Sequence, residues 1–263
     1  LIWAGSLVMS SLWSLGALGC EALFVVAPCH FPVSTAKRIQ AAFQKIRAML
    51  ASDGMQIYDP TKPLIFSHIP KSAGTSVLGI FKTWFGDNLL LHYGPSERHD
   101  LENPPDPTRP VALYGHFNRQ RGKAIDQSYP EVDQFVTILR DPWDRVISGY
   151  FYRTQTPERR QKFPKVAALS LEDYVAHWPF DDPDYGPPSS NFLPRPCDMH
   201  NFREILSTGF IDIGFTEDLP HSIARIAKAL GAPFNPTDLP HINVAPRAHP
   251  VPEHLKPAFI KRN

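Results

Sequence analysis

This chain has few cysteines and almost no net charge. Its 263 residues include only 3 cysteines, Cys20, Cys29 and Cys197, which lack the spacing of a metal-ligand motif and the even number of a disulfide framework. We therefore expect neither a disulfide scaffold nor a metal site. The 27 basic and 26 acidic residues leave a net charge of +1, so no overall field attracts nucleic acid, and no nucleic-acid partner is predicted.

Internal repeats are also absent, which excludes a solenoid. Strand-like and helix-like stretches alternate instead, and this order predicts an α/β fold with a parallel β-sheet flanked by helices. The 28 prolines gather in loops, notably 103–110 and 178–190, which can be neither regular helix nor central strand.

A first strand-to-helix junction predicts an anion site. The apolar strand at residues 64–66 runs into a short loop with a lysine and a glycine, and a helix with apolar residues at spacings of three and four follows. Gly74 lets the backbone approach a ligand closely, and Thr75 or Ser76 is the expected helix cap. The candidate binding residues are Pro70, Lys71, Ser72, Ala73, Gly74, Thr75 and Ser76.

This loop differs from the P-loop of nucleoside triphosphatases. The P-loop pattern places a Gly-Lys pair at the end of the loop, whereas Lys71 here precedes Gly74. A nucleotide kinase or phosphatase remains an alternative, and it would need Mg²⁺ and a carboxylate such as Asp141. An ordinary turn with a solvated lysine is the structural alternative.

A second junction has the same form. The strand at residues 135–139 ends at Arg140, and Asp141 and Pro142 begin a helix as acidic N-cap and first helical residue. Arg145 and Ser148 share one side of that helix. Two arginines and a hydroxyl at the end of a strand are typical of a phosphate clamp, although Arg145 could instead pair with an aspartate on the surface.

Together the two motifs resemble the sulfotransferases that use 3′-phosphoadenosine-5′-phosphosulfate (PAPS), in particular the heparan/uronyl 2-O-like carbohydrate branch. The resemblance spans about residues 62–247. It implies the P-loop-like nucleotide-binding sulfotransferase fold, with the 5′-phosphosulfate held by the loop at 70–76 and the 3′-phosphate held by Arg140, Arg145 and Ser148. It implies PAPS as co-substrate without a metal, and a carbohydrate or other hydroxyl compound as acceptor. A non-catalytic nucleotide-binding protein is the remaining alternative.

A histidine between the two motifs is the candidate base. The short strand at residues 111–115 ends in Gly115-His116, and His116 resembles the base of the uronyl 2-O-sulfotransferases. Imidazole suits this task because it titrates near neutral pH. Lys71 is the second catalytic candidate. The other candidate bases are His68, Glu97 and Glu102.

The C-terminal half predicts one further strand-helix unit. A strand near residues 209–219 precedes a helix at 221–230 that Gly231 ends. The segment 241–247 resembles a loop that folds over the nucleotide, with Arg247 as an additional phosphate ligand. Candidate sugar contacts are Tyr185, Phe192 and Arg195. Because family members usually continue through another helix, a truncated C-terminus stays open.

The N-terminal part divides into two segments ahead of a predicted sulfotransferase domain at 58–263. Residues 1–30 form a hydrophobic leader or membrane segment, and 31–57 an amphipathic helix and linker. Membrane association through residues 1–27 would leave the catalytic domain in the cytoplasm, because basic residues follow the segment. The expected location is therefore cytoplasmic or membrane-associated, or the Golgi lumen in a eukaryote, which requires the opposite orientation.

Overall fold

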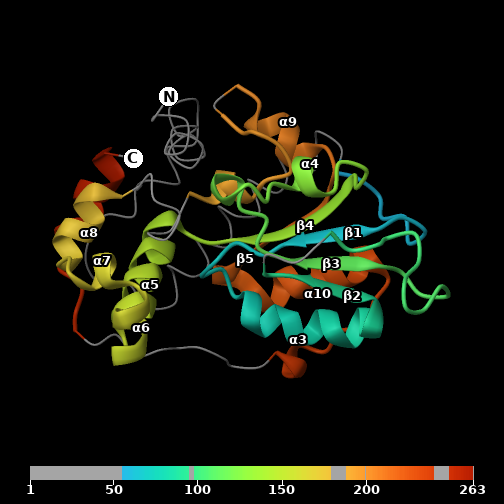
Figure 1. Ribbon diagram of the computed structural model, residues 1–263, viewed down its shortest axis with the longest axis horizontal. Coiled ribbons are helices and arrows are strands. Elements are labelled where there is room, and N and C mark those ends of the chain that lie inside the picture. The colour runs from blue at the N-terminus through green and yellow to red at the C-terminus, as the bar shows by residue number, and fades with distance from the viewer. Residues whose placement is uncertain (1–54, 95–97, 179–187, 199, 240–248, 263) are drawn as a thin grey trace.

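The computed structural model describes residues 55–94, 98–178, 188–198, 200–239 and 249–262. Its centre is a five-stranded sheet in the order β2-β3-β1-β4-β5, in which every pair of neighbours is parallel (Figure 1). The strands are β1 (Leu64–Ser67), β2 (Leu89–His92), β3 (Ala112–Gly115), β4 (Gln134–Leu139) and β5 (Phe210–Phe215). This sheet confirms the predicted fold class.

Helices cover both faces of the sheet. On one face lie α3 (Gly74–Phe85) and α10 (Leu219–Leu230), and on the other α4 (Ile125–Ser128) and α9 (Phe202–Ser207) (Figure 1). Side chains alternate between the two faces along each strand. Leu64 and Phe66 of β1 pack with α3 and α10, whereas Ile65 packs with α4 and α9. All three are buried, as in a central parallel strand.

A group of helices lies beyond the carboxyl end of β4. It comprises α5 (Pro142–Thr154), α6 (Pro157–Lys162), α7 (Pro164–Ala167), α8 (Leu171–His177) and α11 (Leu255–Arg262). A separate apolar cluster joins α5, α7, α8 and α11, with Trp143 and Trp178 both packed on Phe259. The short 3₁₀ turns are Gly86–Asn88, Arg119–Arg121, Ser189–Phe192, Thr216–Asp218 and Pro236–Asp238.

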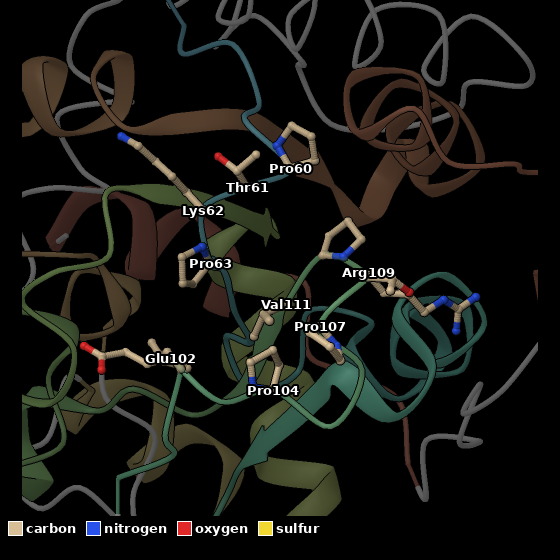
Figure 2. Close-up of a pocket in the computed structure, with 12 residues that line it drawn as sticks. Pro60, Thr61, Lys62, Pro63, Glu102, Pro104, Pro107, Arg109 and Val111 are labelled. Carbon is tan, nitrogen blue, oxygen red and sulfur yellow. The ribbon is translucent and has the colours of Figure 1, made fainter.

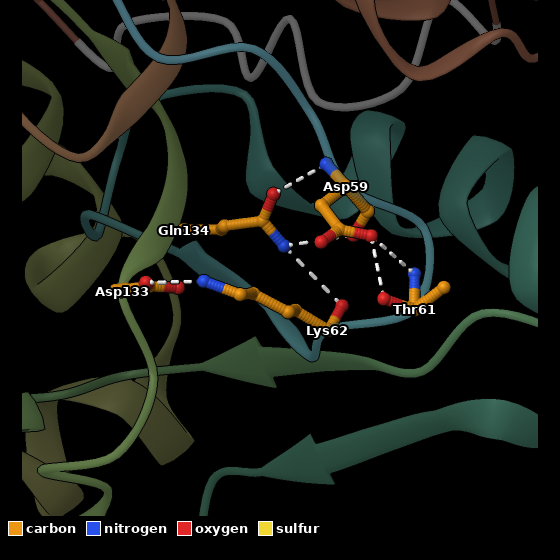
Figure 3. Close-up of polar contacts among 5 residues, drawn as sticks. All are labelled: Asp59, Thr61, Lys62, Asp133 and Gln134. Atoms are coloured by element: carbon orange, nitrogen blue, oxygen red, sulfur yellow. Dashed lines mark hydrogen bonds and ion pairs between the residues drawn. The ribbon is translucent and has the colours of Figure 1, made fainter.

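Hydrogen bonds fasten the chain before β1 to the first residue of β4 (Figure 3). Gln134 is fully buried, and its Oε1 accepts from the Asp59 N–H at 2.6 Å. Its Nε2 donates to the Asp59 and Lys62 carbonyls at 3.0 and 3.3 Å. Lys62 also pairs with Asp133 at 2.8 Å, with both side chains about half exposed. These contacts fix the amino ends of the two central strands.

Several sequence predictions can be compared directly with the described residues. The strands at β1, β3, β4 and β5 are confirmed, as are the start of α5 at Asp141 and the end of α10 at Gly231. β2 has no counterpart among the strands predicted from the sequence. The predicted segments 1–30 and 31–57 lie almost wholly outside the described residues. Among the residues that are described, no helix is long and apolar enough to span a membrane.

Candidate active site

The carboxyl ends of three neighbouring strands place the predicted motifs side by side. The register aligns Ser67 of β1 with Gly115 of β3 and with Thr137 of β4. The residues that follow these strands therefore leave the sheet at one edge, which is where open α/β sheets bind ligands. His68, His116 and Arg140 all lie at this edge.

The loop between β1 and α3 has an unusual backbone. Lys71 and Ala73 have positive φ angles of 69° and 59°, in the left-handed region that non-glycine residues rarely adopt. Such turns direct successive N–H groups toward one side and can bind an anion. The Ser72 hydroxyl is buried without a hydrogen-bond partner among the described residues. A phosphate or sulfonate oxygen could satisfy it.

The N-terminus of α3 differs from the sequence prediction. The helix begins at Gly74 with Ala73 as N-cap, and no side-chain cap bond is made there, so the expected cap at Thr75 or Ser76 is wrong. With the left-handed Ala73 as N-cap, the helix begins two or three residues earlier than expected. The N–H groups of Ser72 and Ser76 donate within the loop, to Ile69 and Ala73. We therefore retain the amides of residues 73–75 as candidate anion donors.

Cations converge on this loop from the second junction. Arg140 donates from Nη1 to the Lys71 carbonyl at 3.0 Å, which fastens the loop to the end of β4. Burial, followed by like-charge repulsion from Arg140, Arg159 and Arg153, lowers the pKa of Lys71 to about 8. A bound anion would relieve that repulsion.

The helices α5 and α6 contribute part of this charge. Lys71 Nζ lies 4.2 Å from the ring centroid of Tyr152, and the guanidinium carbon of Arg159 lies 4.1 Å from the same centroid. Neither Tyr152 nor Arg159 is among the site residues predicted from the sequence. The sequence signal that could have indicated them is the run of basic residues at 159–165, which follows α5.

Arg145 lies in the interior of the protein and not on its surface. Its side chain is only 5% exposed, and its guanidinium carbon lies 6.0 Å from the Trp178 ring centroid. Burial lowers its pKa to about 10, with Arg153 and Arg140 contributing, so it remains charged at neutral pH. Ser148, one turn later on α5, is partly exposed.

His116 is held in one tautomer. Its Nδ1 lies 2.7 Å from the His68 carbonyl oxygen, which can only accept, so Nδ1 carries the proton and Nε2 keeps its lone pair. Burial lowers the pKa of His116 below 6.5, partly offset by the His68 carbonyl bond, and Arg121 lowers it further. The imidazole is therefore neutral at neutral pH, as a general base must be.

Two glycines are required by close neighbours of these histidines. A Cβ at Gly115 would lie 2.0 Å from the His92 carbonyl oxygen, which accepts the His116 N–H. A Cβ at Gly74 would lie 1.7 Å from His68 Nε2. The group that packs against Gly74 is therefore the His68 ring, whereas the sequence predicted that a ligand would approach this glycine. The ring is further fixed by a 2.8 Å contact between His68 Nδ1 and the Tyr93 hydroxyl.

The other candidate bases have weaker positions. Burial, His116 and Lys71 hold the pKa of His68 well below 6.5. Glu102 lines a cavity of about 520 Å³ together with Pro63 and Val111, which precede β1 and β3 (Figure 2). Glu102 therefore lies at the amino edge of the sheet, opposite His116, and the prediction of Glu102 as a base is wrong. Glu97 lies outside the described residues.

Asp141, the carboxylate of the kinase alternative, caps α5. Its Oδ1 accepts from the Asp144 N–H at 3.1 Å, and burial raises its pKa. Its own N–H donates to Glu217 at 2.7 Å. Within the described ranges, no group of three or more His, Cys, Asp or Glu side chains is arranged to hold a metal ion.

The predicted sugar contacts separate into different environments. Phe192 is 1% exposed and belongs to the core, with its ring centroid 6.4 Å from that of His116, so it presents no surface to a sugar. Arg195 forms an ion pair with Glu204 at 2.8 Å. Tyr185 and Arg247 lie outside the described residues.

Comparison with known proteins identifies a related family. The sequence model of the sulfotransferase family matches residues 55–182, just under half of the chain. Among solved structures, mouse sulfotransferase SULT7A1 complexed with PAP is similar over 73% of this chain and 66% of that chain, just under two thirds of its length, with 14% identity and a TM-score of 0.42. No curated protein sequence matches. The family match confirms, for the segment at 55–182 that contains both motifs, the predicted similarity to sulfotransferases.

Proposed function

We propose that this protein is a PAPS-dependent sulfotransferase that transfers a sulfonate group to a hydroxyl of a carbohydrate. The observation that carries the proposal is the gathering of Lys71, Arg140, Arg153 and Arg159 around a strand-to-helix loop. This loop lies within the segment that matches the sulfotransferase family.

The residues at the loop fit a donor with two phosphate groups. PAPS would supply an activated sulfonate on its 5′-phosphate. We assign Lys71, with the amides of residues 73–75 and the orphaned Ser72 hydroxyl, to the 5′-phosphosulfate. The clamp of Arg140, Arg145 and Ser148 would hold the 3′-phosphate, and Arg247 is a further candidate from the sequence. Preorganised cations and N–H groups at such a site stabilise charge that develops on the departing phosphate.

His116 is the proposed base for the acceptor hydroxyl. Its Nε2 lone pair is available because Nδ1 is committed to the His68 carbonyl, and its lowered pKa keeps it unprotonated at neutral pH. During transfer, Nε2 would take the hydroxyl proton while the acceptor oxygen bonds to sulfur. The bond between sulfur and the 5′-phosphate oxygen would break, and adenosine 3′,5′-bisphosphate would leave. The carbohydrate acceptor is supported by the Gly115-His116 motif and its resemblance to the uronyl 2-O branch.

A transfer assay tests this proposal. Radiolabelled PAPS is incubated with a panel of glycans and, for comparison, with simple phenols and alcohols. We expect label on at least one glycan, and a loss on the order of 10²-fold or more for Lys71→Ala and for His116→Ala. Label on phenols alone would refute the carbohydrate acceptor.

A binding experiment separates the alternatives. We expect adenosine 3′,5′-bisphosphate (PAP) to bind equally with and without EDTA, and more tightly than the analogue without the 3′-phosphate. Magnesium-dependent binding of ATP in its place would favour a kinase or phosphatase. Tight PAP binding with no transfer to any acceptor would favour a non-catalytic nucleotide-binding protein.

A further inference from the structure

Two cations from different elements contact the ring of Tyr152 on α5. Lys71 Nζ and the Arg159 guanidinium carbon lie 4.2 and 4.1 Å from its centroid. An aromatic face attracts cations, so one ring interacts favourably with two groups that repel each other. Tyr152 is 38% exposed, so the ring that both cations contact lies at the protein surface.

Arg159 is fixed independently of the donor loop. Its Nη1 donates to Gln155 Oε1 at 2.8 Å and to the Tyr152 carbonyl at 3.4 Å. The guanidinium is therefore attached to the end of α5. On the loop itself, Arg140 binds the main chain of Lys71, whereas the side chain of Lys71 meets Tyr152. Lys71 is thus oriented from two directions.

We propose that Tyr152 and Arg159 are positioning residues for Lys71, holding its ammonium at the mouth of the loop and acting on its charge in opposite directions. The ring favours the ammonium form, whereas the guanidinium opposes it. The proposal deepens the proposed function, on which it depends for the identity of the ligand. The contacts of Lys71 and Arg159 with the Tyr152 ring are present in the protein without a ligand.

The groups that face Lys71 make this balance explicit. They are Arg140 after β4, Arg153 on α5, Arg159 on α6 and His68 after β1. His68 is neutral because its pKa is strongly lowered, so the three arginines supply the repulsion. Burial and these arginines together lower the pKa of Lys71 to about 8. The contact with the Tyr152 ring acts in the opposite direction, because an aromatic face favours the ammonium.

Competitive acetylation of the ligand-free protein measures this balance directly. Only an unprotonated amine reacts with acetic anhydride, so the pH dependence of labelling at Lys71, read by mass spectrometry against exposed Lys82, gives its titration midpoint. Tyr152→Leu should lower the midpoint by roughly half a pH unit, whereas Tyr152→Phe, which keeps the ring, should restore it. Arg159→Gln should raise the midpoint by roughly half a unit.

Arg160→Gln is the matched control, because it removes the same charge from the neighbouring position of α6. Arg160 donates to the Thr154 carbonyl and is not among the three arginines that lower the pKa of Lys71. Equal midpoints for Arg159→Gln and Arg160→Gln would overturn the role of Arg159. Equal midpoints for Tyr152→Leu and Tyr152→Phe would overturn the role of the ring. If Tyr152→Leu does not fold, the pair of α6 variants decides.

PAP binding by the same variants distinguishes this inference from the proposed function. Shifted labelling midpoints without any PAP binding would leave the positioning intact and refute the donor assignment. PAP binding with unshifted midpoints in every variant would retain the donor site and refute the positioning roles.

Discussion

The lowered pKa of Lys71 predicts that the affinity for PAP falls as pH rises. The protonated ammonium binds an anion, and the free protein begins to lose that proton near pH 8 because of burial and the neighbouring arginines. An anion in the site relieves the repulsion and raises the pKa again. Above about pH 8 the complex must therefore take up a proton as it forms.

The magnitude follows from the two pKa values. With a pKa of about 8 in the free protein and an ordinary lysine value of about 10.4 in the complex, the affinity should decrease about tenfold between about pH 7 and about pH 9, or ~1.4 kcal/mol. Over the same range, proton uptake should rise from about 0.1 to about 0.9 per PAP bound. Below about pH 7, Lys71 is charged in both states and contributes no slope.

Isothermal titration calorimetry measures both quantities. Titrations in two buffers with different ionisation enthalpies give the affinity and the number of protons taken up at each pH. Lys71→Arg is the control, because a guanidinium keeps its proton over this range and should remove the uptake. The same uptake and the same slope in wild type and Lys71→Arg would refute the assignment of this titration to Lys71.

Three further predictions concern the base and the sheet. His116→Ala should reduce kcat by ~10²–10⁴-fold and leave the affinity for PAP unchanged. Because the pKa of His116 is lowered, the kcat of the wild type should fall only as the pH drops below 6.5. A loss of PAP affinity that matches the loss of kcat would show that His116 is structural. Gln134→Leu leaves three backbone groups unpaired, so the free energy of unfolding measured in urea should fall by ~2–3 kcal/mol. The control Asp133→Asn removes only an exposed ion pair and should cost less than ~1 kcal/mol. Equal losses for the two variants would contradict this prediction. Gly115→Ala should lower the melting temperature, because its Cβ would clash with the His92 carbonyl. Gly79→Ala on α3, where an added Cβ meets no atom within 4 Å, should instead stabilise the protein by ~0.5–1 kcal/mol. Stable folding of both variants would refute the close approach of Gly115 to β2.

The local patterns in the sequence predicted most of the sheet and both junctions. The strands β1, β3, β4 and β5 are short apolar runs followed by turn residues, and the start of α5 has its acidic cap and proline in sequence. These signals are local, so they can be read without knowing the fold. β2 was missed because it has only four residues at the edge of the sheet and its burial comes from neighbours distant in sequence.

The predictions about the site that were wrong concern features that depend on tertiary geometry. The cap of α3 was misplaced because Ala73 adopts a left-handed conformation that its residue type does not predict. Glu102 is near the first motif in sequence but at the other edge of the sheet. Phe192 packs in the apolar core, and the Ser67 hydroxyl, from a residue distant in sequence, donates to its carbonyl. The contact of Tyr152 with Lys71 joins elements that no periodicity connects.

The place of β1 at the centre of the sheet constrains the order in which the protein can fold. Leu64 pairs with Ala112 on one side and with Gln134 on the other, so β1 gains its neighbours only after much of the following chain has been made. Such non-local pairing slows folding and leaves an apolar strand exposed in the meantime. During synthesis, the donor loop therefore acquires its Arg140 anchor only after β4 has left the ribosome. A nascent chain halted before that point would contain the complete Lys71 loop and still lack the support that shapes it.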